Sequence, residues 1–529
     1  MELAQRRPVG GRGWGIAAVS AAALVSAPLL LLPLSFAKRS GTWSIVADLL
    51  PGALGRSLLL ALGVAVGTLL LGTSLAILVS FYEFPGRRFV EWAVVLPLGM
   101  PAYILTFVML GQYDGSTALK SVATSMGFAR LPEVRSPGGA ILMLTLVLYP
   151  YVYLLARTAF LGQSAGLLEA ARTLGLSHGG AIRRVALPLA RPALAAGTTL
   201  AVMEALADFG TVNLLGFRTL PDAIYRLWYG AFDRRAALQL GAVLLGLVAL
   251  LVLIERSTRR RSVAQSTSGP GVTERRKLRS WRAVLALLIP LTFLTIVLVG
   301  PVVQLTFWAI DSVRDSTYDP SLWKNARNSV LLALLTAVLT AVIAVAVVFA
   351  VRIAPSRTRR ASVRAATLGY AVPGSVAAAA VFLIADSVGA TFDVALTGTL
   401  AVLVAAYCLR FTTLAVQAAE SRMAALPPSL DAAARSLGAS PGRLLAEVHV
   451  PLLLPAIGTG ALLVFVEVLK ELPATALLRP FGLDTLPISV FEATKESLYE
   501  AAALPALALL IVSTLPVAFL VRSARATRP

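Results

Sequence analysis

The chain has 529 residues, of which 57% are hydrophobic and only 14% are charged. A soluble domain carries about 25% charged residues, so the composition excludes an ordinary soluble protein and indicates an integral membrane protein. The net charge of +20 would suggest nucleic-acid binding in a soluble protein. Here the basic residues flank apolar segments, where they set orientation and meet membrane lipid, so no nucleic-acid partner is expected.

Long apolar segments recur along the chain and predict an all-α polytopic membrane protein with about twelve transmembrane helices. Each half of the chain contributes six of them. The predicted spans of the first half are 14–37, 57–82, 92–111, 138–156, 192–215 and 236–254. Those of the second half are 283–310, 328–351, 365–385, 394–409, 450–470 and 501–521.

Basic residues predict the orientation of these spans. Arg6, Arg7 and Arg12 precede the first apolar segment, which is longer than the core of a cleaved signal peptide. We therefore expect a retained first span with its amino end in the cytoplasm. The short loops rich in Lys and Arg then share that side, so both termini are predicted to be cytoplasmic.

An internal repeat divides the chain into a first half, 1–255, and a second half, 283–529, joined by a basic linker, 256–282. The stretch 168–194, shifted by 263 positions, falls within the stretch 430–457 and matches it. Because each half has an even number of spans, the halves are expected to share one orientation, related by a pseudo-twofold axis along the membrane normal.

The repeat is most detailed in two polar loops, 164–192 and 427–455. Gly175 and Gly438 stand where a helix ends in a left-handed residue. Each loop therefore predicts a short helix, a glycine corner and a second helix that face water, a shape that another protein can grip.

Serines and prolines complete this pattern. Ser164 and Ser429 are predicted to cap the first helix of each loop, and Ser177 and Ser440 the second. A proline is expected to close the second helix, at Pro188 and at Pro451.

The first loop resembles a known motif. Its run Glu169-Ala170-Ala171, followed after three residues by Gly175 and later by Pro188, resembles the EAA loop of ABC-importer permeases. In that family the loop forms a coupling helix that docks into a cleft of the cytoplasmic ATPase. The matching residues of the second loop are Ala433, Ala434, Gly438 and Pro451, with Asp431 one position before Ala432, which stands in the place of Glu169. Whether Asp431 replaces that glutamate is an open question at this point.

Two such loops in one chain resemble the fused permeases of the ferric-iron and thiamine importers. The resemblance implies a type I importer permease of the bacterial inner membrane, a transport subunit with no catalytic residue, metal site or cofactor of its own. It implies as partners two ABC ATPase subunits and a periplasmic or lipid-anchored substrate-binding protein. No Gly-x-x-x-x-Gly-Lys-Ser/Thr sequence occurs in the chain, so ATP hydrolysis is expected in a separate subunit.

Four carboxylates follow the two loops at matching positions: Glu204 and Asp208, then Glu467 and Glu471. Carboxylates within spans are costly and usually face a cavity or a partner, so they are candidates for the lining of a translocation path. The alternative is a hydrogen bond to a neighbouring helix end. We expect Glu204 about midway through its span.

The substrate is the least determined feature. The stretches 205–211 and 470–475 resemble those of ferric-iron permeases, and hard oxygen ligands suit a hard cation, which favours iron(III). Thiamine, polyamine, phosphonate and sulfate importers use similar loops. A secondary transporter with two six-helix halves and a membrane scaffold are alternatives of other classes.

Three further predictions concern single residues and external segments. Cys408 is expected to be inert packing, and His178 and His449 to be solvated loop residues. The segments 217–235 and 472–500 are candidates for docking the substrate-binding protein.

Overall fold

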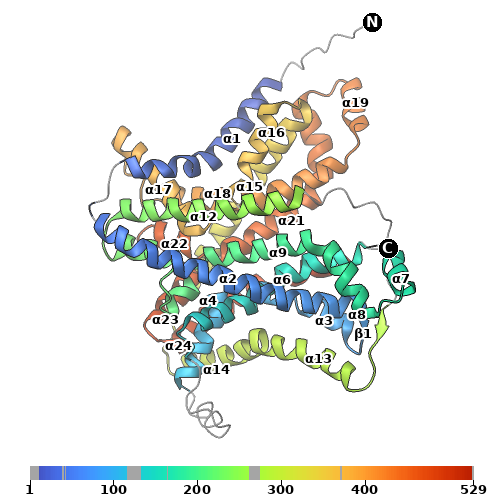
Figure 1. Ribbon diagram of the computed structural model, residues 1–529. Helices are drawn as coiled ribbons and strands as arrows, with labels where there is room; N and C mark the ends of the chain where they lie inside the picture. Colours follow the sequence, from blue (N-terminus) through green and yellow to red (C-terminus); the bar gives the residue numbers. More distant parts are fainter. Residues whose placement is uncertain are drawn as a thin grey trace. The chain divides into compact units, whose positions relative to one another are not determined.

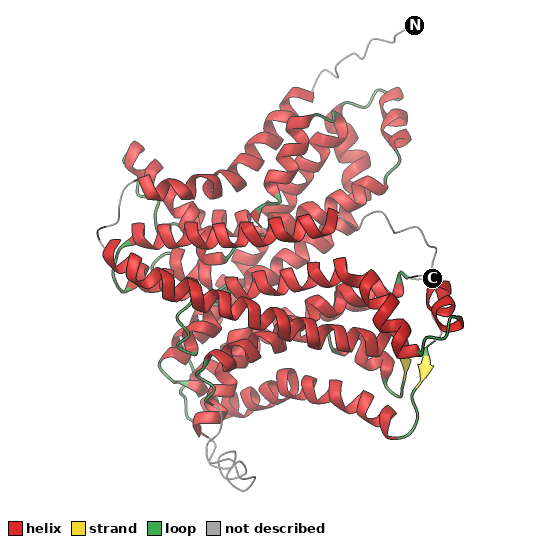
Figure 2. Cartoon of the chain, in the orientation of Figure 1, coloured by secondary structure: helices red, strands yellow, loops and turns green. Residues whose placement is uncertain are grey.

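The computed structural model describes residues 11–37, 41, 43–115, 133–163, 165–260, 275–369 and 372–526. Nearly all of the regular structure is helical, and the strands of the described part are β1 (Tyr82–Glu83) and β2 (Arg276–Lys277), which pair in parallel (Figure 2). By length and apolar composition, 10 described helices could cross a membrane, or 11 if one bent pair counts as a span. The predicted all-α polytopic class is confirmed.

The described elements form two compact units (Figure 1). The first unit comprises residues 1–42, 227–242 and 321–488. Its elements are α1 (Gly11–Leu31), η1 (Leu32–Ala37), α15 (Leu322–Ile353), α16 (Arg357–Ala366), α17 (Gly374–Phe392), α18 (Leu400–Ala425), α19 (Pro428–Ser436), α20 (Pro441–Leu444), η7 (Leu445–His449), α21 (Val450–Leu469), α22 (Pro473–Leu478) and the start of α12 (Arg234–Arg260) and of α23 (Leu486–Lys495).

The second unit comprises residues 43–226, 243–320 and 489–529. Besides β1 and β2, its elements up to the end of the first half are α2 (Trp43–Phe81), α3 (Arg87–Ala93), η2 (Leu96–Gly99), α4 (Ala102–Gly115), α6 (Pro137–Leu161), α7 (Ala165–Thr173), α8 (His178–Ala181), η3 (Ile182–Ala186), α9 (Leu187–Ala207), α10 (Gly210–Leu214), α11 (Leu220–Tyr229) and α12 (Arg234–Arg260). The others are α13 (Trp281–Leu294), η5 (Thr295–Val299), α14 (Gly300–Arg314), α23 (Leu486–Lys495) and α24 (Tyr499–Ala526).

Each unit combines helices from both halves of the sequence. In the first unit, α1 from the first half packs against α15, α16 and α17 from the second half. In the second unit, α13 and α14 from the second half pack against α3 and α4 from the first. The compact units therefore do not follow the boundaries of the sequence repeat, because the first helices of each half cover helices of the other half.

The repeat is visible in the core of each unit. Helices α2, α6 and α9 pack on one another in the second unit, as α15, α18 and α21 do in the first. A β-carbon on Gly197 of α9 would lie 2.8 Å from the Cα of Val152 on α6. At the matching position, a β-carbon on Gly460 would lie 3.1 Å from the Cα of Ala415. Small residues thus let the helices approach closely at matching crossings, as is typical of membrane helices.

Two predicted spans have different shapes in the structure. The segment 92–111 is a helix pair bent by 89°, because prolines at 97 and 101 interrupt it. The segment 365–385 is also interrupted, since α16 ends at Ala366 and α17 begins only at Gly374. The last predicted span, 501–521, lies in α24, whose segment Tyr499–Thr514 is an apolar helix.

Candidate functional site

The first polar loop is built around a left-handed glycine. Helix α7 ends and Gly175 follows with φ of +89°. Its N–H donates to the carbonyl of Arg172 at 3.0 Å, and the N–H of Leu176 donates to the carbonyl of Ala171 at 3.1 Å. This pair of hydrogen bonds closes the carboxyl end of a helix and requires a positive φ at the corner.

The second polar loop repeats this geometry. After α19, Gly438 has φ of +81°, and its N–H donates to the carbonyl of Arg435 at 3.0 Å. The N–H of Ala439 donates to the carbonyl of Ala434 at 3.0 Å. The predicted left-handed corners at Gly175 and Gly438 are confirmed.

The predicted serine caps are confirmed for the second helix of each loop. The Oγ of Ser177 accepts the N–H of Gly180 at 3.1 Å, and that of Ser440 accepts the N–H of Arg443 at 3.4 Å. The cap predicted at Ser429 is wrong, because α19 begins at Pro428 without a side-chain cap. Ser164 lies outside the described residues.

The prediction that Pro188 and Pro451 close the second helix is wrong. The chain stays helical from His178 to Ala207 and from Pro441 to Leu469. A π-helical turn, η3 or η7, comes shortly before each proline. The N–H of the residue that follows this turn donates to the carbonyl oxygen of the residue five positions earlier. This extra residue in the turn lets a helix pass a proline, which has no N–H to donate.

Each corner presents an apolar side chain. Leu174 and Leu437, which match in the repeat, are each 86% exposed. Glu169, Ala170 and Ala433 are exposed as well, whereas Ala171 is buried. The two corners therefore expose the same apolar side chain at the same place in the repeat.

The two loops are anchored differently. Leu168 and its repeat partner Asp431 are both 6% exposed. Leu168 belongs to the hydrophobic core of the second unit, together with Ala171, Ile182 and Phe160. The first loop is thus held by apolar packing.

The second loop is held by charge. The carboxylate of Asp431 lies 2.7 Å from Nε of Arg352, at the end of α15, and 3.1 Å from Nε2 of His449 in η7. Asp431 therefore points inward and does not present a carboxylate at the surface as Glu169 does. The prediction that His449 is solvated is wrong: its side chain is fully buried, with its ring 5.4 Å from that of Phe349.

We expect Asp431→Ala to destabilise the protein by about 3 kcal/mol, because it leaves the partly buried Arg352 guanidinium and the buried His449 ring without their carboxylate. The midpoint of thermal unfolding in detergent should fall, as measured by fluorescence of a thiol dye. Glu447→Ala is the matched control, since the Arg443–Glu447 pair is 63% and 59% exposed and should contribute under about 1 kcal/mol. Equal midpoints for the two variants would contradict this anchoring role.

Four carboxylates follow the loops, at the points where α9 and α21 end. Glu204 lies in the last turn of α9, not midway through a span, because the helix ends at Ala207. Glu467 lies in the last turn of α21, with Oε1 2.9 Å from Nζ of Lys470. Both side chains are partly exposed.

Asp208 and Glu471 hold the helix breaks that follow. Oδ1 of Asp208 accepts the N–H groups of Thr211 and Val212 at 2.9 and 3.3 Å, which caps α10. Glu471 accepts the N–H of Ala474 at 2.9 Å, at the start of α22, and pairs with the buried Arg410. These bonds satisfy the free N–H groups of two short helices.

The sequence analysis did not predict the two arginines that form ion pairs here, Arg352 with Asp431 and Arg410 with Glu471. Arg352 comes directly after the predicted span 328–351, and Arg410 directly after the predicted span 394–409. The available signal was a lone arginine bordering apolar segments, since such a charge needs a partner when it is buried.

The duplicated loops and broken helices define a permease class. The family model of the binding-protein-dependent transport system inner membrane component matches residues 68–256 and 342–528, one match in each half. The chain belongs to this family. It is a multi-pass inner-membrane protein, an ABC-importer permease in which two repeats are fused.

The relatives of this chain include permeases named for several different substrates. An Fe(3+)-transport system permease protein of Haemophilus influenzae is 29% identical over 469 residues, covering 88% of both chains. A probable molybdenum ABC transporter permease of Haloferax volcanii is 34% identical over 35% of this chain and 66% of its own. A probable sulfate transport permease of Prototheca wickerhamii is 30% identical over 38% of this chain and 79% of its own.

Proposed function

We propose that this permease carries iron(III) across the inner membrane, driven by ATP hydrolysis in two separate ATPase subunits. The observation that carries the substrate class is similarity along 88% of the chain to an Fe(3+)-transport permease, whereas the molybdenum and sulfate relatives match about a third of it. The likeness of the stretches 205–211 and 470–475 to ferric-iron permeases supports the same substrate.

The two loops are the proposed contacts for the ATPase subunits. Leu174 and Leu437 would each enter an apolar cleft, and burial of a leucine contributes roughly 1.5–3 kcal/mol. Because each corner is rigid and each loop is anchored in its own unit, a movement of the ATPase would be transmitted to α9 and α21. Those helices are continuous with the loops through η3 and η7.

Glu204 and Glu467 are the proposed path residues. They match in the repeat, and both lie one turn before a helix break, where partial exposure leaves the carboxylates accessible. In broken helices of transporters, such ends commonly face the substrate site. Asp208 and Glu471 would instead keep the breaks in place.

Exposed aromatics support a docking role for the two external segments. Phe232 is 83% exposed and Phe481 fully exposed, one in 217–235 and one in 472–500. Aromatic side chains at an interface supply much of the binding energy, so these two would contact the proposed substrate-binding protein.

Uptake measurements with candidate substrates test the proposal. The permease would be reconstituted in proteoliposomes with its proposed ATPase and substrate-binding partners. We expect ATP-dependent uptake of radioactive iron(III) and none of molybdate or sulfate. Uptake of an oxyanion without iron(III) would overturn the substrate and leave the permease class intact.

Cysteine labelling tests the proposed orientation. Single cysteines at Ser262, in the linker, and at Glu496, between α23 and α24, would be introduced in a Cys408→Ala background. In intact spheroplasts, we expect an impermeant thiol reagent to label position 496 and to reach position 262 only after lysis. The reverse pattern would place the basic loops outside and contradict the predicted topology.

A further inference from the structure

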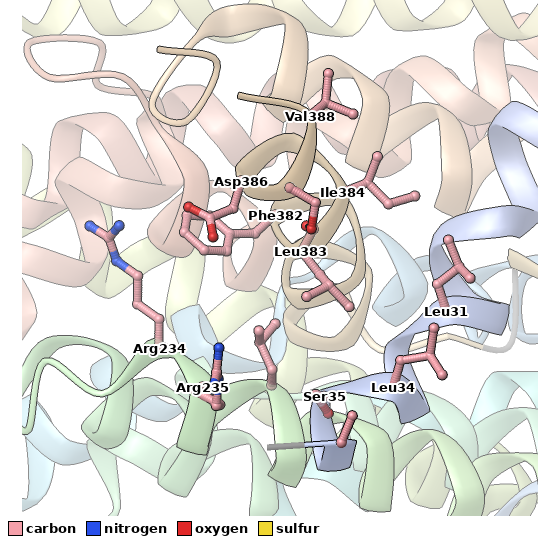
Figure 3. Close-up of a pocket in the computed structure, with 13 residues that line it drawn as sticks. Leu31, Leu34, Ser35, Arg234, Arg235, Phe382, Leu383, Ile384, Asp386 and Val388 are labelled. Atoms are coloured by element: carbon pink, nitrogen blue, oxygen red, sulfur yellow. The ribbon is translucent and has the colours of Figure 1, made fainter. Parts of the chain in front are cut away.

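A cavity of about 590 Å³ lies in the first unit between η1, the start of α12 and the middle of α17 (Figure 3). Its volume is within the range of roughly 300–1,000 Å³ that is typical of small-molecule sites. None of the loop or path residues described above lines it. It is therefore a second candidate binding site.

The walls of the cavity are separated by polarity. Figure 3 shows Arg234, Arg235 and Asp386 on one side and the apolar side chains of Leu31, Leu34 and Ile384 on the other. The three charged residues are exposed. A ligand that fits must have a charged end and an apolar end.

Packing holds one of the arginines in place. The guanidinium of Arg234 lies 5.1 Å from the ring centroid of Phe382 and 5.8 Å from that of Trp228. Cation–π contacts of this kind orient the side chain. They do not use its N–H groups, which can therefore donate hydrogen bonds in the plane of the guanidinium. Arg234 can thus receive an anion with little loss of side-chain entropy.

The cavity lies at the ends of apolar helices. The candidate span Gly13–Ala37 ends beside it, the span Arg234–Glu255 begins there, and Gly374–Phe392 passes it within its last three turns. Arginines at a span end lie at the level of lipid headgroups, and the leucines one to two turns inward lie at the level of acyl chains. With the predicted orientation, this level is the outer leaflet.

We propose that this cavity binds one phospholipid of the surrounding bilayer. Arg234 and Arg235 would bind the phosphate, since arginine suits phosphate geometry, and an acyl chain would lie along Leu31, Leu34 and Ile384. Asp386 adds a negative charge beside the phosphate position. That charge favours a headgroup with an ammonium, so the site selects phosphatidylethanolamine over phosphatidylglycerol.

Native mass spectrometry of the full-length protein tests this assignment. The protein would be released from nanodiscs that contain equal amounts of the two phospholipids, and the bound lipid would be counted. We expect one retained phosphatidylethanolamine in the unmodified protein. Arg234→Gln with Arg235→Gln should lower its occupancy about tenfold, because two phosphate contacts are lost.

Three further variants keep the test decisive if the double arginine variant folds poorly. Leu34→Trp should reduce lipid retention by filling the apolar end, and Asp386→Lys should remove the preference for the ethanolamine headgroup. Arg314→Gln with Arg327→Gln, at exposed positions away from the cavity, should retain lipid normally. Equal lipid retention by all variants would mean adventitious lipid only, and a preference for phosphatidylglycerol in the unmodified protein would also overturn the proposal.

Discussion

Replacing Gly175 and Gly438 together by valine is expected to lower substrate uptake at least tenfold while leaving the protein in the membrane. Both glycines have positive φ, and nothing lies within 4 Å of a β-carbon built on either of them. The penalty is therefore conformational, roughly 1–2 kcal/mol for each residue. The corner should rearrange and move Leu174 and Leu437 out of position, which uncouples ATP hydrolysis from transport.

The chain offers a matched control for this change. Gly179 and Gly442 also match in the repeat, have open space around a β-carbon, and lie in short helices α8 and α20 without positive φ. Their double valine variant should transport nearly normally. Uptake would be measured in proteoliposomes at equal protein amounts, together with ATPase activity. Full uptake by the variant of Gly175 and Gly438 would exclude the coupling role of the loops.

The single variants distinguish the two loops. Glu169 is exposed in the first loop, whereas the second has Ala432 at that position and its nearby Asp431 is buried. We expect Gly175→Val to be more severe than Gly438→Val, because the first loop carries the more complete motif. Equal effects would show that the leucine corner matters more than the exposed glutamate.

A second large loss of substrate uptake is expected when Glu204 and Glu467, the proposed residues of the translocation path, are replaced. Glu204→Gln and Glu467→Gln should each lower uptake, and the double variant should lower it further, by about tenfold or more if both carboxylates face the substrate. The isosteric amide keeps a hydrogen bond but removes the charge. ATPase subunits should still co-purify, because the loops are unchanged.

Asp208→Asn and Glu471→Gln provide the contrast. Their carboxylates cap short helices, and Glu471 also neutralises Arg410, so these changes should reduce the amount of folded protein rather than the transport rate per molecule. Normal uptake by the double Glu204 and Glu467 variant, at equal membrane abundance, would show that these two carboxylates are structural only.

The corners at Gly175 and Gly438 could be predicted because the signal is local. A helix that ends at a glycine and restarts at a serine cap needs only the neighbouring residues to define it. The same local reasoning failed at Pro188 and Pro451. Within a soluble protein a proline usually ends a helix, but here the helix continues into a span whose neighbours stabilise the π-helical turn.

The membrane class, the internal repeat and the two polar loops could be predicted from the sequence, since composition and periodicity depend on residues that are near one another in the chain. The inward position of Asp431 could not, because it depends on the fold. Its partners Arg352 and His449 are 79 and 18 positions away, and no local pattern links them. The same holds for Glu471 with Arg410 and for the cavity of Arg234, whose walls come from three distant segments. Burial and charge pairing depend on distances in space, which the folded chain alone establishes.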